Sequence, residues 1–330
     1  MPLVALARRT PLVLVALTVV AAVAMLAAVR WGSTPLSTAA VLDALAGTGD
    51  EATRAIVREL RLPRVVQSAL VGAALAASGS ALQALLRNPL ADPYVLGISS
   101  GAAVGAVATV VFAATALGSI AMGSAALVGA LLALALVLAI GRAVGGTLDP
   151  RTLVLGGVIV GAFLNALLML ALVTLDLERY RAALFWMLGS NSGADWRGVA
   201  TLAVVVTTAT AWLVARGRAL DALALGEETA HHLGVLVAAS VVTAASVSVA
   251  GTVGFVGLVV PHMLRLALRP SQRVQLVASV LGGAAFLVLA DLAGRAIAPP
   301  NEIPLGAVTA LLGAPVFTWL LVRGERARLA

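Results

Sequence analysis

Residues 223–234 read Leu-Ala-Leu-Gly-Glu-Glu-Thr-Ala-His-His-Leu-Gly, and this short polar stretch separates two long apolar runs. It carries Glu227, Glu228, His231 and His232 within six residues. Such a density of polar groups cannot lie in hydrocarbon, where polar atoms find no water to bind. The stretch therefore indicates a loop outside a membrane and predicts that the apolar runs beside it, at 196–215 and 234–250, cross that membrane.

The composition of the whole chain agrees with this interpretation. Hydrophobic residues make up 61% of the sequence and charged residues 11%, with a mean hydropathy of +1.05. Soluble domains carry about 25% charged residues. The apolar runs are long enough to cross as helices, since about 20 residues span a hydrocarbon core of about 30 Å. Alternating patterns typical of barrel strands do not occur, so we expect an all-α polytopic membrane protein.

The apolar runs predict ten spans in a single transmembrane domain over residues 1–330. A polar external segment at 31–64 follows the first span, and residues 221–234 form a cytoplasmic loop. The first run is longer than the apolar core of about 7 to 15 residues typical of a signal peptide, so we interpret it as a span. The expected spans are 12–29, 65–84, 94–114, 119–141, 152–174, 196–215, 234–250, 255–268, 275–294 and 305–322.

The distribution of arginine orients the chain, because cytoplasmic loops are enriched in basic residues. On the side that holds both termini and the 221–234 loop lie thirteen arginines and six acidic residues. The opposite side holds nine of each, so the net charge of +7 belongs to one face. We therefore expect both termini and the polar loop in the cytoplasm. The external segment 31–64 is rich in arginine and needs a separate explanation.

Two residue types are missing, and each absence excludes a chemistry. All 22 basic residues are arginine, so the chain cannot contain a phosphate-binding G-x-x-x-x-G-K-[ST] loop. If ATP and Mg²⁺ drive this protein, another chain binds them, and we expect no directly bound cofactor. Cysteine is also absent, which excludes disulfides and thiolate metal sites. His231 and His232 diverge by about 100° on a helix, so we predict no metal site.

Glycine, proline and amide residues inside the spans mark packing faces or pathway positions. Small residues recur at three- and four-residue spacing, which lets helices approach closely in lipid. The stretch from Gly251 to His262 contains Gly254, Gly257 and Pro261 and predicts either a pore-side hinge or a plain tight turn. Asn165 and Gln83 lie within spans, where amides either join helices by hydrogen bonds or line a pathway.

A series of ordered motifs covers residues 55–323. In chain order they are Arg61-Leu-Pro-Arg64, Gly72-Ala-Ala-Leu-Ala76, Ser78-Gly79, Gln83, Arg87-Asn-Pro-Leu-Ala-Asp-Pro93, Leu96-Gly-Ile-Ser-Ser-Gly101, Phe185-Trp-Met-Leu-Gly-Ser190, Gly254-Phe-Val-Gly-Leu-Val-Val-Pro-His262, Arg265, Asp291, Arg295, Glu302-Ile-Pro-Leu-Gly306 and Gly313-Ala-Pro315. The series resembles the FecCD/BtuC-type permeases, the membrane subunits of ABC importers for ferric siderophores, haem and cobalamin.

The resemblance implies an assembly. It consists of a homodimer of ten-helix subunits, two ATP-binding cassette ATPase subunits on the cytoplasmic side, and one external substrate-binding protein. The polar loop corresponds to the helix that fits a groove on the ATPase. The predicted coupling residues are Leu225, Gly226, Glu227, Glu228, Ala230, His231, Leu233 and Gly234. Leu225, Ala230 and Leu233 would contact the bundle, the charged residues would face the ATPase, and the two glycines would end the segment.

The same resemblance gives the external arginines a role. In the family, acidic residues of the binding protein pair with arginines at the permease mouth, and Arg61, Arg64 and Arg295 match those positions. Arg54 and Arg58 extend the patch. The alternative is that Arg61 and Arg64 only snorkel toward water at the start of a helix, or balance the charges of Glu59 and Asp291. The family also places an inner gate near the loop before the fifth span, which makes Asp149 and Pro150 gate candidates beside Gly254, Gly257, Asn165 and Gln83.

The function expected from this pattern is transport without catalysis by this chain. It would be the permease of an ABC importer in the bacterial plasma (inner) membrane. Ferric siderophore is the first expected cargo, with haem and cobalamin next. A secondary active transporter driven by an ion gradient is the alternative, although such carriers keep ionisable groups at mid-membrane and no acid lies well inside an expected span. An intramembrane enzyme lacks a recognisable nucleophile and base, and nothing indicates a nucleic-acid partner.

Overall fold

The computed structural model describes residues 2–32, 34–112, 118–145, 149–225, 232–268 and 271–329. Within these ranges every regular element is helical, as expected for an all-α protein. The helices are α1 (Pro2–Arg30), α2 (Thr38–Ala46), α3 (Glu51–Ala55), the π-helix η1 (Ile56–Arg61), α4 (Leu62–Leu85), the 3₁₀ helix η2 (Pro93–Leu96), α5 (Ile98–Val111), α6 (Gly118–Gly145), α7 (Pro150–Val173), α8 (Leu177–Met187), α9 (Trp196–Ala215), α10 (Gly217–Leu225), α11 (His232–Ala250), α12 (Val256–Leu268), α13 (Gln272–Ala296) and α14 (Leu305–Leu329).

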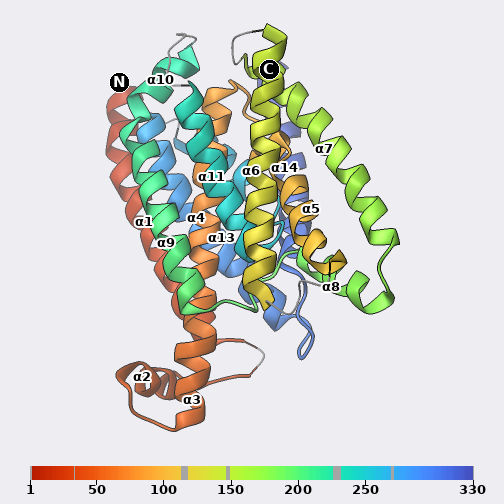
Figure 1. Ribbon diagram of the computed structural model, residues 1–330. Coiled ribbons are helices and arrows are strands. Elements are labelled where there is room, and N and C mark those ends of the chain that lie inside the picture. Colours follow the sequence, from red (N-terminus) through yellow and green to blue (C-terminus); the bar gives the residue numbers. More distant parts are fainter. Residues whose placement is uncertain are drawn as a thin grey trace.

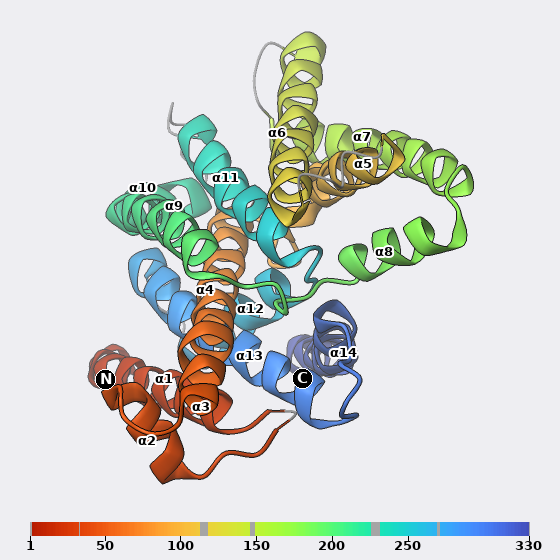
Figure 2. The same ribbon diagram turned by 60° about the horizontal axis from the view of Figure 1, so that its bottom comes forward.

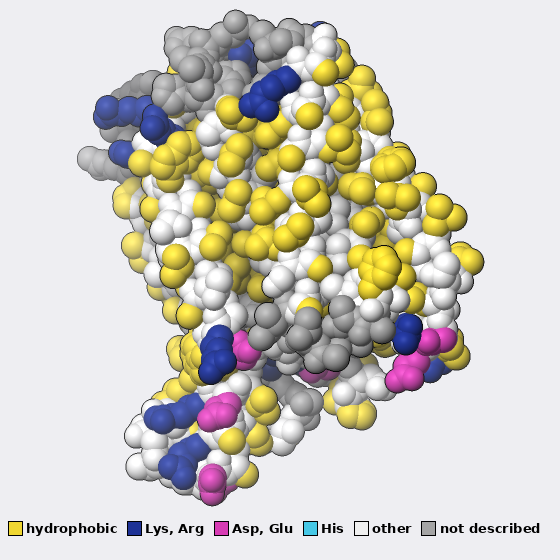
Figure 3. Space-filling model, in the orientation of Figure 1, with side chains coloured by type: hydrophobic (Ala, Val, Ile, Leu, Met, Phe, Trp, Pro, Cys, Tyr) yellow, Lys and Arg dark blue, Asp and Glu magenta, His cyan; other side chains and the backbone are white. Residues whose placement is uncertain are grey.

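The ten expected spans correspond to α1, α4, α5, α6, α7, α9, α11, α12, α13 and α14. Seven of these helices are long and apolar enough to cross a membrane, and α5, α12 and α14 contribute shorter apolar segments. The start of α1 and the end of α14 lie at the same end of the bundle (Figure 1). Charged side chains on the face shown in Figure 3 concentrate at its two ends, while hydrophobic side chains cover the middle. The architecture is therefore that of a polytopic membrane protein.

Helix α4 is the central helix of the bundle and is buried along most of its length. Glycine allows its neighbours to approach backbone to backbone: a Cβ added at Gly72 would lie 2.1 Å from the Gly283 carbonyl oxygen on α13. One added at Gly79 would lie 1.9 Å from the Gly257 carbonyl oxygen on α12. Any larger residue would therefore separate α4 from α13 or α12. The spacing of small residues in the sequence predicted this kind of packing.

The glycine-rich stretch after α11 interrupts the helical structure. Residues 251–255 are non-helical, and Gly251 and Phe255 both have a φ of 68°. Neighbouring groups satisfy the exposed backbone: Tyr94 Oη donates to the Val253 carbonyl and accepts from the Val253 amide, each at 3.0 Å. The Thr252 hydroxyl donates to the Met187 carbonyl. Such a break inside the membrane is stable because protein surrounds it; a hinge at this position stays a prediction.

The external segment 31–64 has more structure than the sequence indicated. Helices α3, η1 and α4 form one continuous helical stretch over residues 51–85, so the span expected at 65–84 is only its inner part. Its outer part extends beyond the bundle and packs with α2 into a helical hairpin (Figures 1 and 2). We call residues 37–61 the external hairpin. It has its own stabilising contacts, described below.

Helix α7 lies at the edge of the bundle, where it packs against α5, α6 and η2. Only 28% of its most apolar window is buried, as in α6 and α9, and in Figure 1 it runs along the right-hand edge. In Figure 2, helix α8 lies between α7 and α14 at the end of the bundle that faces the viewer. The outer face of α7 is thus left without a partner helix in the described part of this single chain.

Candidate functional site

The segment predicted to be cytoplasmic begins with α10, which packs against α4 and α13. Leu220 is fully buried, and the Asp221 carboxylate accepts a hydrogen bond from the Gln272 amide at 2.8 Å. That amide belongs to the first residue of α13, whose own N-cap, Ser271, makes no side-chain capping bond. Asp221 therefore satisfies an otherwise orphaned N–H at the start of α13. Any displacement of α10 acts directly on α13.

Most of the predicted coupling residues lie outside the described residues: Gly226, Glu227, Glu228, Ala230 and His231. Leu225 is the last residue of α10, and Leu233 packs against the buried core from the first turn of α11. The expectation that Gly234 ends the coupling segment is wrong, because it is the third residue of α11. A Cβ there would lie 3.0 Å from Trp212 Cη2, so this glycine makes room for the indole.

At the external end, Arg64 lies between two carboxylates. It donates through Nε and Nη2 to Asp291 at 2.9 to 3.2 Å, and through Nη1 and Nη2 to Glu302 at 2.8 and 2.9 Å. Asp291 also forms an ion pair with Arg295 Nε at 3.1 Å. Helices α4 and α13 and the loop before α14 meet here. The predicted balance between Arg64 and Asp291 is thus present, and Glu302 takes a larger part in it than expected.

The other two matched arginines have different partners. Arg61 donates to the carbonyls of Val29, Arg30 and Thr34. Arg295 donates to the carbonyls of Ala28 and Trp31 at 3.1 and 3.4 Å. Both side chains are buried, with the residues 6% and 4% exposed, and together they bind the carbonyls that the end of α1 leaves unpaired. In this structure they are turned inward, so their direct contact with a binding protein stays a prediction.

Arg54 and Arg58 stabilise the external hairpin. Arg54 donates to the Gly47 carbonyl at 3.2 Å and Arg58 to the Leu45 carbonyl at 2.6 Å, both at the end of α2. The Arg58 carbonyl, inside η1, accepts from Trp196 Nε1 at 2.9 Å and links the hairpin to α9. Asp50 caps α3, and its hydrogen bonds with Thr53 keep the pKa of this carboxyl below its ordinary value. Each of these contacts gives the external segment a defined shape.

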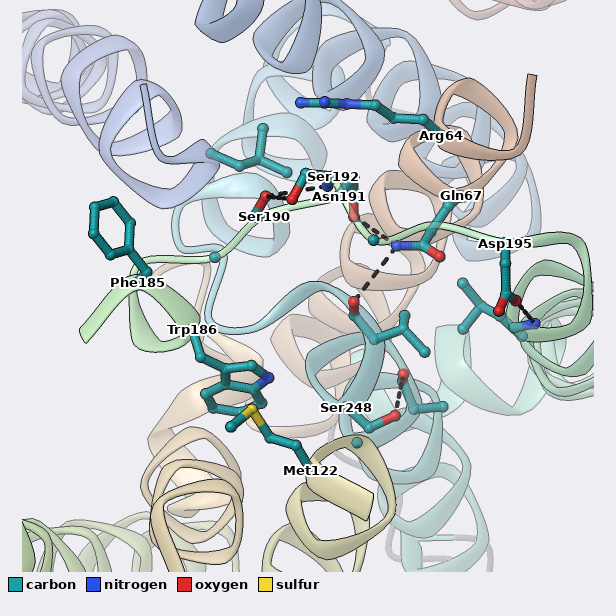
Figure 4. A pocket seen from close by; sticks show the side chains of 18 of the residues that line it. Arg64, Gln67, Met122, Phe185, Trp186, Ser190, Asn191, Ser192, Asp195 and Ser248 are labelled. Carbon is teal, nitrogen blue, oxygen red and sulfur yellow. Dashed lines mark hydrogen bonds between the residues drawn. The ribbon is translucent and has the colours of Figure 1, made fainter. Parts of the chain in front are cut away.

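A cavity of about 1060 Å³ opens next to this cluster (Figure 4). One wall is polar: Gln67 donates to Asn191 at 2.9 Å, and Asn191 donates to Ser68 at 2.8 Å. The opposite wall is apolar and includes Met122 and Trp186. Arg64, Asp291 and Glu302 form part of its lining. The cavity therefore offers hydroxyl and amide groups on one side and apolar surface on the other.

Two of the predicted pathway candidates are buried in the core. Gln83 is 1% exposed and donates to the carbonyls of Gly257, Leu258 and Ala91 at 3.3 to 3.4 Å. Gly257 lies at the crossing with α4, where it contacts Gly79. In this chain both therefore join helices, which was the alternative interpretation of such residues. A role of either in lining a pathway finds no support in these contacts.

The remaining gate candidates lie on or next to α7 and in the non-helical stretch before α12. Asp149 caps α7 by accepting from the Arg151 amide at 3.0 Å, and Pro150 is the first residue of that helix, a position that proline favours. Asn165 is exposed on the outer face of α7. A Cβ at Gly254 would meet no heavy atom within 4 Å. Within the described ranges, no three His, Asp or Glu side chains come together as a metal site would require.

Comparison with known proteins identifies the family. The model of the FecCD transport family matches residues 18–323, which is nearly the whole chain. The chain belongs to the FecCD transport family. It is thus an ABC transporter permease, a transport subunit rather than a catalytic one, as the sequence motifs predicted.

Relatives within the family agree on the kind of protein. A cobalamin import system permease of Halobacterium salinarum is 46% identical over 82% of this chain and 74% of its own length. The vitamin B12 import system permease of Escherichia coli O6:H1 is 41% identical over 82% of this chain and 84% of its own. A solved structure, of a metal-chelate type ABC transporter in an inward-facing conformation, covers 95% of this chain and 99% of its own with a TM-score of 0.83 and 27% identity.

Several residues that organise this FecCD permease were not singled out from the sequence as functional. Asp221, Trp196 and Asn191 act through bonds to distant backbone or side chains, and Glu302 was noted only as part of a motif. Glu302 lies 238 residues from Arg64. An acidic residue in the Glu302-Ile-Pro motif, on the same side as the arginine-rich segment, was the one available signal, and opposite charge could have suggested the pair.

Proposed function

We propose that this chain is the permease subunit of an ABC importer for a cobalamin-type corrinoid. The observation that carries the proposal is the 46% and 41% identity, each over 82% of this chain, to permeases named for import of cobalamin and vitamin B12. Because these relatives are named for cobalamin and vitamin B12, we place a ferric siderophore, which the sequence alone puts first, and haem after cobalamin. The cavity lining is compatible with this choice, because it combines polar groups with apolar surface, as a large ligand with both kinds of group needs.

The working unit we propose is a homodimer with a pathway between the two copies. Helix α7 supports this, because it exposes the amide of Asn165 as well as large apolar side chains such as Phe163 and Met169. An amide in the middle of a span is costly against lipid tails and finds a partner in a second protein surface or in water. A second copy facing α7 would supply either one.

The proposed energy source is a pair of separate ATPase subunits on the cytoplasmic side. The absence of lysine from this chain supports a partner that binds ATP and Mg²⁺. In the proposed mechanism, closure of the ATPases moves the segment around Glu227 and Glu228, and α10 passes the movement to α13 through Asp221. Because α13 runs to Asp291 and Arg295, this one helix joins the cytoplasmic and external sites.

The external partner we propose is a substrate-binding protein with acidic residues on its contact surface. Arg64 and Arg295 pair with Asp291, Arg64 pairs also with Glu302, and Arg61 lies close to Arg295, so these five residues together carry a net charge of +1. An acidic surface would complement that charge. Arg64 lines the cavity, and Arg54 and Arg58 would contribute from the hairpin.

The proposed location is the cytoplasmic (plasma) membrane of a bacterium or archaeon, with both termini in the cytoplasm. The excess of arginine on the side of the termini supports this orientation. The helical hairpin then projects outward, where a binding protein would arrive.

A competition experiment tests the cargo. Cells in which this chain is the permease for corrinoid uptake should accumulate labelled cyanocobalamin. An excess of unlabelled cyanocobalamin should suppress the uptake, and an excess of a ferric hydroxamate siderophore or of haem should leave it unchanged. Uptake of labelled ferric siderophore or haem, with none of cyanocobalamin, would reverse the assignment.

A further inference from the structure

Arg64 has almost no hydrogen-bonding capacity left for a partner. A guanidinium carries five N–H donors. Asp291 takes the Nε donor and one on Nη2, while Glu302 takes one on Nη1 and one on Nη2. One Nη1 donor remains among these described contacts. A bidentate bond from an incoming carboxylate needs two donors, so it requires one of the two resident carboxylates to leave.

The two carboxylates differ in how firmly they are fixed. The Asp291 side chain is 2% exposed, sits on α13 and is shared with Arg295. The Glu302 side chain is 35% exposed and lies in the short connection between α13 and α14. Displacing Asp291 would leave the buried Arg295 guanidinium without its counter-charge, which is far more costly than moving a half-exposed side chain into water. Glu302 is therefore the one that can leave.

We propose that Glu302 is an internal substitute for the acidic residue of the binding protein and that docking exchanges one carboxylate for the other on Arg64. The inference rests on the proposed docking of an acidic partner at this cluster. Before docking, Glu302 shields Arg64, whose side chain is 13% exposed. On docking, the partner's carboxylate takes the Nη1 and Nη2 donors and Glu302 turns to solvent.

The exchange would also reach the membrane-spanning part of the chain. Glu302 immediately precedes the backbone bonds that fix the start of α14: Leu305 donates to the Gly189 carbonyl and Gly306 to the Leu188 carbonyl, each at 2.9 Å. The Ile303 amide donates to the Gly294 carbonyl at 3.0 Å. Releasing Glu302 removes the side-chain bonds that join this connection to α4, and the backbone bonds then remain as its attachment.

The test measures how tightly the purified binding protein of the same importer binds the permease in nanodiscs, at several salt concentrations. Glu302→Gln keeps the shape of the side chain and removes its charge, so Arg64 no longer has to exchange a carboxylate. We expect binding about fivefold tighter, with a steeper dependence on salt. Glu178→Gln, an exposed acid on α8 at the same end of the molecule, is the matched control and should leave the affinity unchanged.

The variants separate this inference from the docking proposal beneath it. If Arg64→Ala weakens binding but Glu302→Gln leaves it unchanged or weakens it, docking stands and the exchange is wrong. If Arg64→Ala has no effect on binding, the docking proposal itself fails. Should Glu302→Gln not fold, Glu302→Asp keeps the charge but is too short to span both donors. It should then tighten binding to an intermediate degree, and an affinity at or below that of the parent chain would contradict the exchange.

Discussion

Neutralising Asp291 is the most severe single change that the external cluster predicts. The carboxylate is 2% exposed and lies within 3.1 Å of two guanidinium groups, those of Arg64 and Arg295. Asp291→Asn keeps the shape but raises the net charge of the cluster from +1 to +2. Removing one partner of a buried ion pair costs about 3 to 5 kcal/mol. Because the Asp291 carboxylate pairs with two cations, we expect the free energy of unfolding to fall by an amount at the upper end of that range.

Asp176→Asn is the matched control. Asp176 also pairs with an arginine, Arg179, at 3.4 Å, but its side chain is 60% exposed. An asparagine there still accepts the capping bond from the Arg179 amide. Exposed pairs contribute about 0.5 kcal/mol or less. The same chemical change should therefore barely alter the free energy of unfolding at the start of α8 and lower it strongly in α13.

The assay is unfolding of the purified permease in mixed micelles with increasing SDS, followed by tryptophan fluorescence. The Asp291→Asn variant should unfold at a clearly lower SDS fraction than the parent chain, while Asp176→Asn should coincide with it. Equal and small shifts for both variants would refute the view that the buried cluster depends on this one carboxylate.

Three further predictions concern the bundle and its cytoplasmic side. Gly79→Ala should destabilise the fold by about 2 kcal/mol or more, because its Cβ would overlap a backbone carbonyl, whereas Gly254→Ala should leave the unfolding curve unchanged. Asp221→Ala should remove the cap of α13, at a cost of about 1 kcal/mol, and lower the substrate moved per ATP hydrolysed; an unaltered ratio in proteoliposomes would contradict the link. Replacing both Glu227 and Glu228 with alanine should weaken co-purification of the ATPase while the permease still elutes as a folded dimer, and undiminished association would show that other residues make this contact.

The span pattern was predictable because it depends on local composition. Each run of about 20 apolar residues indicates a helix whatever surrounds it, and the ten expected spans correspond to ten helices. The ends of a helix were harder to predict where the helix continues beyond the membrane into water. The helical stretch over 51–85 begins well before the apolar run, because its outer turns are stabilised within the external hairpin rather than by lipid.

The partners of the polar residues were harder to predict, because they depend on which helices meet. Arginines of the external segment and of α13 indicated a docking surface, yet Arg61 and Arg295 bind carbonyls at the end of α1. Every residue has a backbone carbonyl, so the sequence does not show which carbonyl an arginine will bind. Gln83 and Gly257 are a similar case, since both lie in the tight contact between α4 and α12. In the sequence, an amide residue that joins two helices cannot be distinguished from one that lines a pathway.

The central claim is that this chain moves its cargo only as part of an ATP-driven assembly. The most direct measurement is uptake of labelled cyanocobalamin into proteoliposomes that contain the permease, with the ATPase, the binding protein and ATP each present or omitted. The account predicts uptake only when all are present, and none when a proton or sodium gradient replaces ATP. Uptake driven by an ion gradient, with the permease as the sole protein, would contradict it.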